Sequence, residues 1–541
     1  METFVGYVIV FGIVIVFMAI AIYNRATEAA EFYVAGRRIP AFWNGMAVAA
    51  DWMSAASFIS MAGALYALGY DGLAYIMGWT GGYVLLALLI APYLRKFGKY
   101  TVPDFIAERY ESDFARLVAL ITAIVISFTY MVGQVAGVGI IMGRLFEIPF
   151  ELGIAIGMVV IIATTILGGM KSITWTQVAQ YIVLITAYLL PVSILAAQWF
   201  GVPLPQFLYG KVLQNIVELE TQYGISPHYI EPFAKFNMAQ FLALTFVLMA
   251  GTAALPHILM RFFTTPSVRD ARVSAGWALF FIGLLYLTAP AYAAFSKFVI
   301  LKDVVGKPVD QLPAWAQKWA ETGLFKVIDK NGDGIIQWAE LNIHRDIVVL
   351  ATPEIAGLIA VVSFFVMAGG LAAALSTADG LLLVIAAAIS NDLYAKMISP
   401  SAPEKKVVLI GKVAVAVAGV IGGFVAAQKI AFIVQIVAWA FSLATASFFP
   451  ALVLGVFWKR LNKEGAIAGL VVGLLVTIAY IYLNKVHGFS IGGIQHTASG
   501  IFGLAANLVV TVVVTMLTPP PSERIQKLVE ELRYPKRIHE V

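Results

Sequence analysis

Long apolar blocks separated by short polar segments make up most of the chain. Thirteen of these blocks reach about twenty residues, which is the length that an α-helix needs to cross the hydrocarbon core of a bilayer. They lie near residues 4–23, 41–68, 73–94, 115–145, 152–170, 174–199, 236–263, 273–299, 355–388, 407–427, 432–457, 465–485 and 498–517. The pattern therefore predicts an all-α polytopic membrane protein with about 13 transmembrane helices.

Two of these blocks contain residues that interrupt a helix in mid-membrane. The second block carries a carboxylate and several hydroxyls at 49–57, and the seventh carries Gly251 and Pro256, which break or kink helices. The two interruptions are five helices apart. Because five is odd, the units that they begin enter the membrane from opposite sides, as in transporters built from inverted repeats with substrate sites at the breaks. An ordinary kinked helix is the alternative for the seventh block.

The ninth block contains oxygen atoms clustered at helical spacing. In a helix, the Thr377 hydroxyl points back to the Ala373 carbonyl, and Ser376 lies three residues from the same carbonyl. A small cation such as Na⁺ needs about five or six oxygen ligands, by analogy with Ca²⁺ and Mg²⁺, and an interrupted helix at 49–57 would supply the remaining carbonyls. The alternative is that Ser376 and Thr377 only bond their own backbone and ease close helix packing.

Composition supports one membrane domain. Of 541 residues, 61% are hydrophobic and 12% are charged, and the mean hydropathy is +0.87, which fits a polytopic membrane protein. The chain has no cysteine, so disulfides and thiolate metal sites are excluded. We expect no enzyme, because no pairing of nucleophile and base, nucleotide loop or His-rich metal site stands out.

Positive charges orient the helices. The net charge of +5 is an orientation signal and not a nucleic-acid-binding patch, because the basic residues fall in short loops that alternate onto one side. These residues are Arg25, Arg37, Arg38, Arg95, Lys96, Lys99, Arg109, Arg116, Arg269, Arg272, Lys396, Lys405, Lys406, Lys412, Lys459, Arg460 and Lys463. We expect the N-terminus outside and the C-terminus in the cytoplasm, in the inner (cell) membrane of a bacterium. The first block lacks a basic n-region and a cleavage site, so we expect a retained helix.

Two predicted outward loops are longer than the others, at 201–235 and 300–354. The second contains 329–340, which matches the EF-hand loop template at each defining position. Its candidate Ca²⁺ ligands are Asp329, Asn331, Asp333, the backbone of Ile335, Gln337 and Glu340. The segment predicts a weak structural Ca²⁺ site that braces the loop, and a chance acidic turn is the alternative.

Several runs of residues resemble the sodium:solute symporter family, and within it the acetate or monocarboxylate permeases. The resemblance is carried by Phe-Tyr-Val-Ala-Gly-Arg at 32–37, residues 51–60, Gly-Tyr-Asp-Gly-Leu at 69–73, Leu-Pro-His-Ile-Leu-Met-Arg-Phe-Phe-Thr at 255–264 and Ser-Asn-Asp-Leu-Tyr at 390–394. It implies the leucine-transporter fold, with five plus five core helices in inverted repeat. The expected divisions are an N-terminal helix and linker at 1–40, repeats at 41–200 and 236–460, further helices at 461–518 and a tail at 519–541.

The resemblance also implies a sodium site and a neighbouring acid. The family's common Na⁺ site combines carbonyls of the first broken helix with a carbonyl and hydroxyls of the ninth helix, which here are Ala49, Trp52, Ala373, Ser376 and Thr377. Asp51 corresponds to the acidic residue beside that site, where it accepts backbone amides of the unwound turn and balances charge. Asp379, which some acetate permeases do not keep, faces a hydrated cytoplasmic cavity or serves a second cation or a proton.

The implied substrate is a small monocarboxylate such as acetate, propionate or pyruvate, carried inward with Na⁺ as the coupling ion. Helix breaks near Met53-Ser54 and Gly251-Thr252 would offer unpaired amides to a carboxylate. The expected lining consists of Ser54, Ser57, Tyr130, Gln134, Gly251, Thr252, Gln435 and Trp439, with plain packing as the alternative for the aromatic residues.

Two other functions remain open at this stage. A proton-coupled carboxylate carrier would keep the fold and change only the ion. A non-transporting membrane sensor of Ca²⁺ or carboxylate is disfavoured, because the tail beyond Pro521 is too short to hold an output domain.

Overall fold

The computed structural model describes residues 1–25, 28–99, 101–167 and 170–534, so the end of the predicted tail lies outside the described residues.

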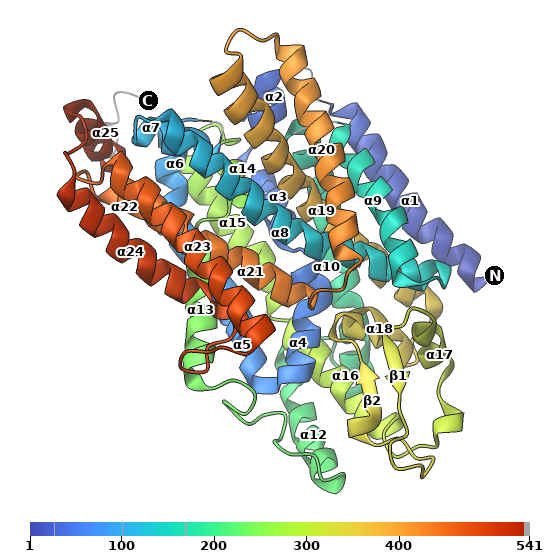
Figure 1. Cartoon of the computed structure of the whole chain (residues 1–541). Coiled ribbons are helices and arrows are strands. Elements are labelled where there is room, and N and C mark those ends of the chain that lie inside the picture. Colours follow the sequence, from blue (N-terminus) through green and yellow to red (C-terminus); the bar gives the residue numbers. More distant parts are fainter. Residues whose placement is uncertain (26–27, 100, 168–169, 535–541) are drawn as a thin grey trace.

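Each of the thirteen apolar blocks is helical, and the helices form one bundle (Figure 1). They are α1 (Glu2–Tyr23), α3 (Ala41–Trp52) with α4 (Met61–Leu68), α5 (Leu73–Leu85) with α6 (Ala91–Phe97), α8 (Asp113–Phe146), α9 (Phe150–Ile166), α10 (Met170–Phe200), α13 (Met238–Thr252) with α14 (Pro256–Phe262), α15 (Val268–Tyr286) with α16 (Ala289–Asp303), α19 (Ala360–Ala387), α20 (Glu404–Ala426), α21 (Ile433–Ala446) with α22 (Phe448–Phe457), α23 (Lys463–His487) and α24 (Gly500–Leu517).

Fewer helices than thirteen are long and apolar enough to span a bilayer as single units. Within the described residues there are 10, or up to 11 with the bent pair α13 and α14. The predicted number is higher because Ala56–Phe97 runs continuously through two blocks and α9 has only 17 residues. Gly69, with φ of 63°, lets the chain turn between α4 and α5. The prediction of an all-α polytopic membrane protein is confirmed.

Smaller elements gather at the two ends of the bundle (Figure 1). The segments predicted as long outward loops form α11 (Pro205–Leu208), α12 (Gly210–Gln222), α17 (Ala314–Glu321), β1 (Phe325–Val327), β2 (Leu341–Ile343) and α18 (Val348–Ile355), while α2 (Ala29–Val34), α7 (Val102–Arg109) and α25 (Glu523–Arg533) complete the chain. The two strands pair antiparallel, with Phe325 opposite Ile343. Asp71 fixes the first of these segments, because its carboxylate accepts the backbone amides of Phe233, Lys235 and Phe236 at 2.7–2.9 Å.

Both predicted helix interruptions are present. The second block stops at the end of α3, and after three residues the chain resumes as a wide π-helical turn (Ala56–Ser60) that leads into α4. The seventh block bends by 41° between α13 and α14, and Pro256 takes the first position of α14, where its missing amide hydrogen is no loss.

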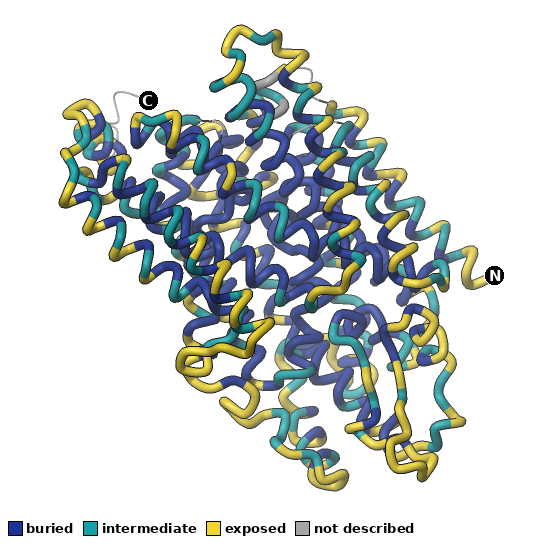
Figure 2. The backbone as a smooth tube through the Cα atoms, in the orientation of Figure 1, coloured by how far each residue is buried: buried dark blue, intermediate teal, exposed yellow. Residues whose placement is uncertain are grey.

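The helix that carries the predicted hydroxyls lies at the centre of the molecule. Every residue of α19 from Val366 to Ala387 is buried, whereas α1 has few buried residues. Figure 2 shows this core as dark blue tube through the middle of the bundle, with exposed backbone at the two ends. The polar residues of α19 are therefore enclosed by protein and not by lipid.

Candidate functional site

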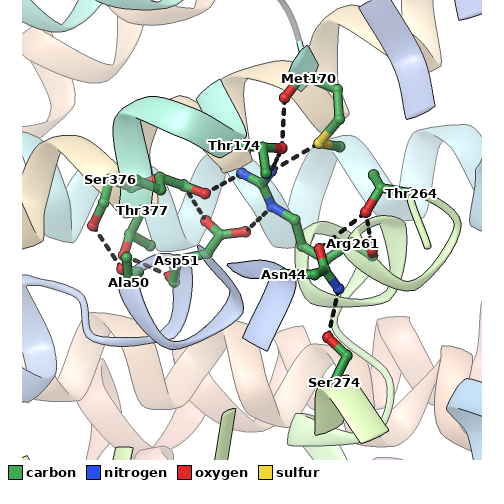
Figure 3. A network of polar contacts seen from close by, with 11 residues as sticks. Asn44, Ala50, Asp51, Met170, Thr174, Arg261, Thr264, Ser274, Ser376 and Thr377 are labelled. Atoms are coloured by element: carbon green, nitrogen blue, oxygen red, sulfur yellow. Dashed lines mark hydrogen bonds and ion pairs between the residues drawn. The ribbon is translucent and has the colours of Figure 1, made fainter. Parts of the chain in front are cut away.

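The end of α3 and the middle of α19 meet through hydroxyl and carbonyl oxygens (Figure 3). The Ser376 hydroxyl lies 2.6 Å from the Ala50 carbonyl oxygen and 2.9 Å from that of Ala373. The Thr377 hydroxyl donates to the Asp51 carbonyl at 2.7 Å. Five neutral oxygens from two segments more than three hundred residues apart therefore converge.

These carbonyls are available because the helix stops. In a continuous helix, the amides of Ser54 and Ala55 would bond the carbonyls of Ala50 and Asp51. Instead, the Ser54 amide donates to the Trp52 carbonyl at 2.8 Å, and the Ala55 amide donates to the side chain of Gln134 at 2.8 Å. The interruption thus frees two carbonyls to face α19.

The two carbonyls that were predicted as sodium ligands flank this pair. The carbonyl of Ala49 accepts the Met53 amide at 2.8 Å, and the carbonyl of Trp52 accepts the Ser54 amide. Ser376 and Thr377 therefore contact the predicted turn, 49–52. They bond the carbonyls of its two middle residues, Ala50 and Asp51, and not those of Ala49 and Trp52.

The Asp51 side chain points away from these oxygens into a buried ion pair. Its carboxylate accepts the Arg261 Nε–H at 3.1 Å and the Gln177 amide at 3.2 Å. Both charged side chains are fully buried. The expectation that Asp51 accepts backbone amides is wrong, because an arginine on α14 and an amide on α10 take that place.

The Arg261 guanidinium makes hydrogen bonds through each of its three nitrogens. Besides Asp51, its guanidinium donates to the Thr174 hydroxyl at 2.7 Å, to the Met170 sulfur at 2.9 Å and to the Gln177 carbonyl oxygen. The Gln177 amide also donates to the Ser376 carbonyl, so the ion pair is joined to the oxygen cluster. Arg261 was not proposed from the sequence, although a basic residue inside an apolar block signals a buried acidic partner.

Asp379 lies one turn beyond Ser376 and faces α9. Its carboxylate accepts the hydroxyls of Thr165 at 2.5 Å and Thr164 at 3.1 Å, and its side chain is buried. In this structure its carboxylate is bonded to two hydroxyls of α9, and its predicted role stays a prediction.

Three predicted substrate residues hold the α3 break in place. The Ser54 hydroxyl accepts the Ala56 amide at 3.0 Å, Ser57 bonds the Tyr286 hydroxyl at 3.1 Å, and Gln134 accepts the Ala55 amide. The Tyr286 hydroxyl also accepts the indole N–H of Trp52 at 2.6 Å. These side chains therefore stabilise the unwound turn.

The residues at the second break have a different role from the predicted one. Gly251 and Thr252 end α13, so they present the carbonyl end of a half-helix and not the predicted amide end. The Thr252 hydroxyl donates to the Leu248 carbonyl at 2.7 Å, and Gly251 packs against the backbone of Phe441 with no room for a side chain.

The two residues of α21 that were predicted to line the substrate site, Gln435 and Trp439, bond partners away from the breaks. Trp439 donates its indole N–H to His496 at 2.8 Å, and Gln435 caps the start of α21 by accepting the Phe432 amide at 3.3 Å. Phe441 faces the breaks instead, with its ring 5.3 Å from Trp52 and 5.9 Å from Tyr130. Gln435 and Trp439 thus bond Phe432 and His496 and not residues of the two breaks.

The EF-hand-like segment folds as a closed loop between the two strands. Oxygens of Asp329, Asp333 and Glu340 lie within 4.8 Å of one another. The Asp329 carboxylate accepts the amides of Gly332 and Gly334 at 2.8 and 3.0 Å. Side chains of Asn331 and Gln337 bond Asp333, and the backbone amide of Ile335 donates to Asp333.

Comparison with known proteins identifies the family. The model of the sodium:solute symporter family matches residues 32–311 and 343–473. The chain belongs to this family. An uncharacterized symporter of Cupriavidus necator is 39% identical over 638 aligned positions, which cover 98% of this chain and 93% of that protein. An uncharacterized symporter of Bacillus subtilis is 29% identical over 490 positions, which cover 90% of this chain and 86% of that protein.

Solved structures support the same fold. A Na⁺-coupled sialic acid symporter in a substrate-bound outward-open state superposes with a TM-score of 0.71 at 16% identity, covering 96% of this chain and 99% of that one. Inward-facing Mhp1 gives a TM-score of 0.50 at 13% identity, covering 95% and 98%. The predicted leucine-transporter fold is confirmed, while the boundaries of its repeats stay a prediction. The family match leaves out 312–342, which contains the EF-hand-like segment.

The buried ion pair of this symporter predicts a strong stability effect. Arg261→Met leaves the Asp51 carboxylate buried without a cation, which costs about 3–5 kcal/mol. We expect a clearly lower melting temperature of the detergent-solubilised protein, and a double variant Asp51→Asn, Arg261→Gln that loses less than the sum of its single changes. Lys459→Met is the control, because the Lys459–Glu530 pair is exposed and such pairs contribute little. Equal melting temperatures for Arg261→Met and Lys459→Met would contradict the assignment.

Proposed function

We propose that this symporter carries a small monocarboxylate such as acetate, propionate or pyruvate, inward and together with Na⁺. Membership of the sodium:solute symporter family makes sodium-coupled symport its functional class. The observation that carries the proposal is the convergence of the Ser376 and Thr377 hydroxyls on carbonyls that the interrupted helix leaves free.

The proposed Na⁺ site lies between α3 and α19. Its ligands are the oxygens of Ala373, Ser376 and Thr377 and the carbonyls of the turn 49–52. A hydroxyl can rotate its hydrogen away and present its lone pairs to a cation, so Ser376 and Thr377, which donate to carbonyls of this turn, would instead offer oxygen ligands to Na⁺. Arg261 already balances the charge of the Asp51 carboxylate. Asp379 is the other acid near the proposed Na⁺ site, and its carboxylate is bonded only to neutral hydroxyls.

Coupling between Na⁺ and the carboxylate follows because both would bind at the α3 break. Na⁺ would tie the end of α3 to α19, and the carboxylate would bind beside the same break. Each ligand then favours the conformation in which that turn is correctly placed, and two ligands that favour one conformation bind cooperatively.

The substrate class is supported by unpaired donors around the break. The indole N–H of Trp79 and the hydroxyl of Tyr83 are buried and have no hydrogen-bond partner among the described residues. Their rings lie 6.3 and 4.9 Å from the ring of Trp52. A small carboxylate presents acceptor oxygens to such donors and otherwise fits apolar aromatic walls.

Replacement of a hydroxyl ligand tests the coupling ion. Thr377→Ala removes a contact to a charge that is worth roughly 1.5–3 kcal/mol. We therefore expect the half-saturating Na⁺ concentration for uptake of labelled acetate or pyruvate into proteoliposomes to rise about ten- to hundredfold. Thr186→Ala is the matched control, because Thr186 is a threonine that bonds its own helix at an exposed position.

The same assay separates the rival functions. Uptake that follows a pH gradient and ignores Na⁺ would support a proton-coupled carrier instead. Carboxylate binding without uptake under either gradient would support a sensor.

We also propose that the loop 329–340 binds Ca²⁺ as a structural ion, through Asp329, Asn331, Asp333, Ile335, Gln337 and Glu340. The proposal is supported by the match to the EF-hand template and by the close approach of three carboxylates. The positive φ of Gly334, 72°, gives the sharp turn that the template requires at its sixth position.

Calcium should stabilise the protein through this loop. At a concentration about tenfold above the dissociation constant, binding to the folded state adds about 1.4 kcal/mol. We expect Ca²⁺ to raise and EGTA to lower the melting temperature, and Asp333→Asn to abolish the difference. Asp310→Asn, an exposed acid outside the template, should respond like the wild type. A wild-type melting temperature that is independent of Ca²⁺ would rule the ion out.

The proposed orientation puts the loops with α12 and the strands outside. The chain has no cysteine, so single cysteines can be labelled without background. We expect an impermeant maleimide to label Thr221→Cys in intact cells, and Ser401→Cys only after permeabilisation; both positions are exposed. The reverse pattern would invert the topology.

A further inference from the structure

His257 is a buried side chain with unused polar atoms at the second break. It is the second residue of α14, directly after the interruption, and only 1% of it is exposed. Neither ring nitrogen has a hydrogen-bond partner among the described residues. Buried polar groups are nearly always paired, so an imidazole with two unpaired nitrogens points to a group that the protein alone does not supply.

The surroundings of His257 connect the two breaks. Its ring lies 5.1 Å from the ring of Tyr130 on α8, and Gln134, one turn further along α8, accepts the Ala55 amide at the α3 break. Tyr130 also lies 5.9 Å from Phe441, which packs against Gly251. His257 therefore lies beside residues that contact both broken segments and not in a remote part of the core.

The other nitrogen-rich side chain of α14 is not available. Arg261, one turn further along, donates to Asp51, Thr174 and Gln177. A guanidinium is the usual partner of a carboxylate, but this one already has a carboxylate. His257 is thus the α14 side chain that retains a free donor.

We propose that His257 donates a ring N–H to a carboxylate oxygen of the transported solute. A neutral imidazole carries one N–H donor and one acceptor nitrogen, so it binds a carboxylate by one hydrogen bond and adds no charge to the site. This inference rests on the proposed monocarboxylate function and assigns the residue that recognises the carboxylate.

Two variants separate the donor from the ring. His257→Phe keeps an aromatic ring beside Tyr130 and removes both nitrogens, whereas His257→Gln keeps an N–H donor. At saturating Na⁺, we expect the KM for acetate or pyruvate uptake to rise at least tenfold in His257→Phe and much less in His257→Gln. Ser363→Ala is the control, because it removes another buried polar atom that has no partner among the described residues and that lies in the first turn of α19, and its KM should equal that of the wild type.

A binding measurement without transport separates the carboxylate from the ion. In His257→Phe, Na⁺ alone should still raise the melting temperature, while the additional rise caused by acetate at saturating Na⁺ should be lost. Thr377→Ala should show the opposite defect, with a weakened response to Na⁺. A wild-type acetate response in His257→Phe would overturn the inference and leave the proposed function intact.

The wild-type protein and the folding of His257→Phe provide two further tests. A wild-type protein that neither binds nor carries any monocarboxylate would overturn both the proposed function and this inference. If His257→Phe does not fold, the imidazole ¹⁵N resonances of the wild type decide, with His257 identified by its absence from the His257→Gln spectrum. A shift of the His257 resonance on addition of acetate supports the contact, and an unchanged resonance overturns it.

Discussion

An interrupted helix inside a membrane protein leaves carbonyl groups that must find partners, and this constraint organises the centre of the molecule. In hydrocarbon an unpaired carbonyl is costly, so the break after α3 is possible only where another element covers it. The hydroxyls of Ser376 and Thr377 on α19 do so. Because α19 is the most deeply buried long helix of the described chain, the covering contact is also shielded from lipid and water. The oxygens that stabilise the break are the same oxygens that suit a cation.

The hydrogen-bond donors at the centre fall into two groups, those that are bonded within the protein and those that have no partner among the described residues. Arg261 joins α14 to α3 and α10 through Asp51, Thr174 and Gln177, and this pairing balances the buried charge. An anion at the same place would have to compete with Asp51 for the guanidinium. Neutral donors with free hydrogens, at Trp79, Tyr83 and His257, do not meet that competition. The proposed substrate site, built from them, would bind a small anion without disturbing the ion pair between α3 and α14.

The fold was largely predictable from the sequence because membrane helices are encoded locally, by the length of apolar blocks and by residues that interrupt them. The meeting of residues 49–52 with Ser376 and Thr377 was predicted from the same chemistry and a family resemblance. The identity of the carbonyls that face α19 was not predictable. It depends on which acceptors the amides of Ser54 and Ala55 find, and a different choice shifts the free carbonyls by one residue. The partner of Asp51 was missed for a related reason: Arg261 is 210 residues away in the chain, and only the packing of α14 against α3 brings them together.

The segment outside the family match packs against helices of the central bundle. Trp338, within the EF-hand-like loop, packs its ring 4.0 Å from the Lys297 ammonium and 6.0 Å from the ring of Tyr66 on α4. Just after the second strand, the Asp346 carboxylate accepts the Ser60 hydroxyl at 2.5 Å and the Ile433 amide at 3.0 Å. The loop and its flank therefore hold the continuation of the interrupted helix against the start of α21. The loop thus contacts α4, which follows directly on the π-helical turn after the α3 break, so the surface segment and the central site are joined by one short stretch of helix.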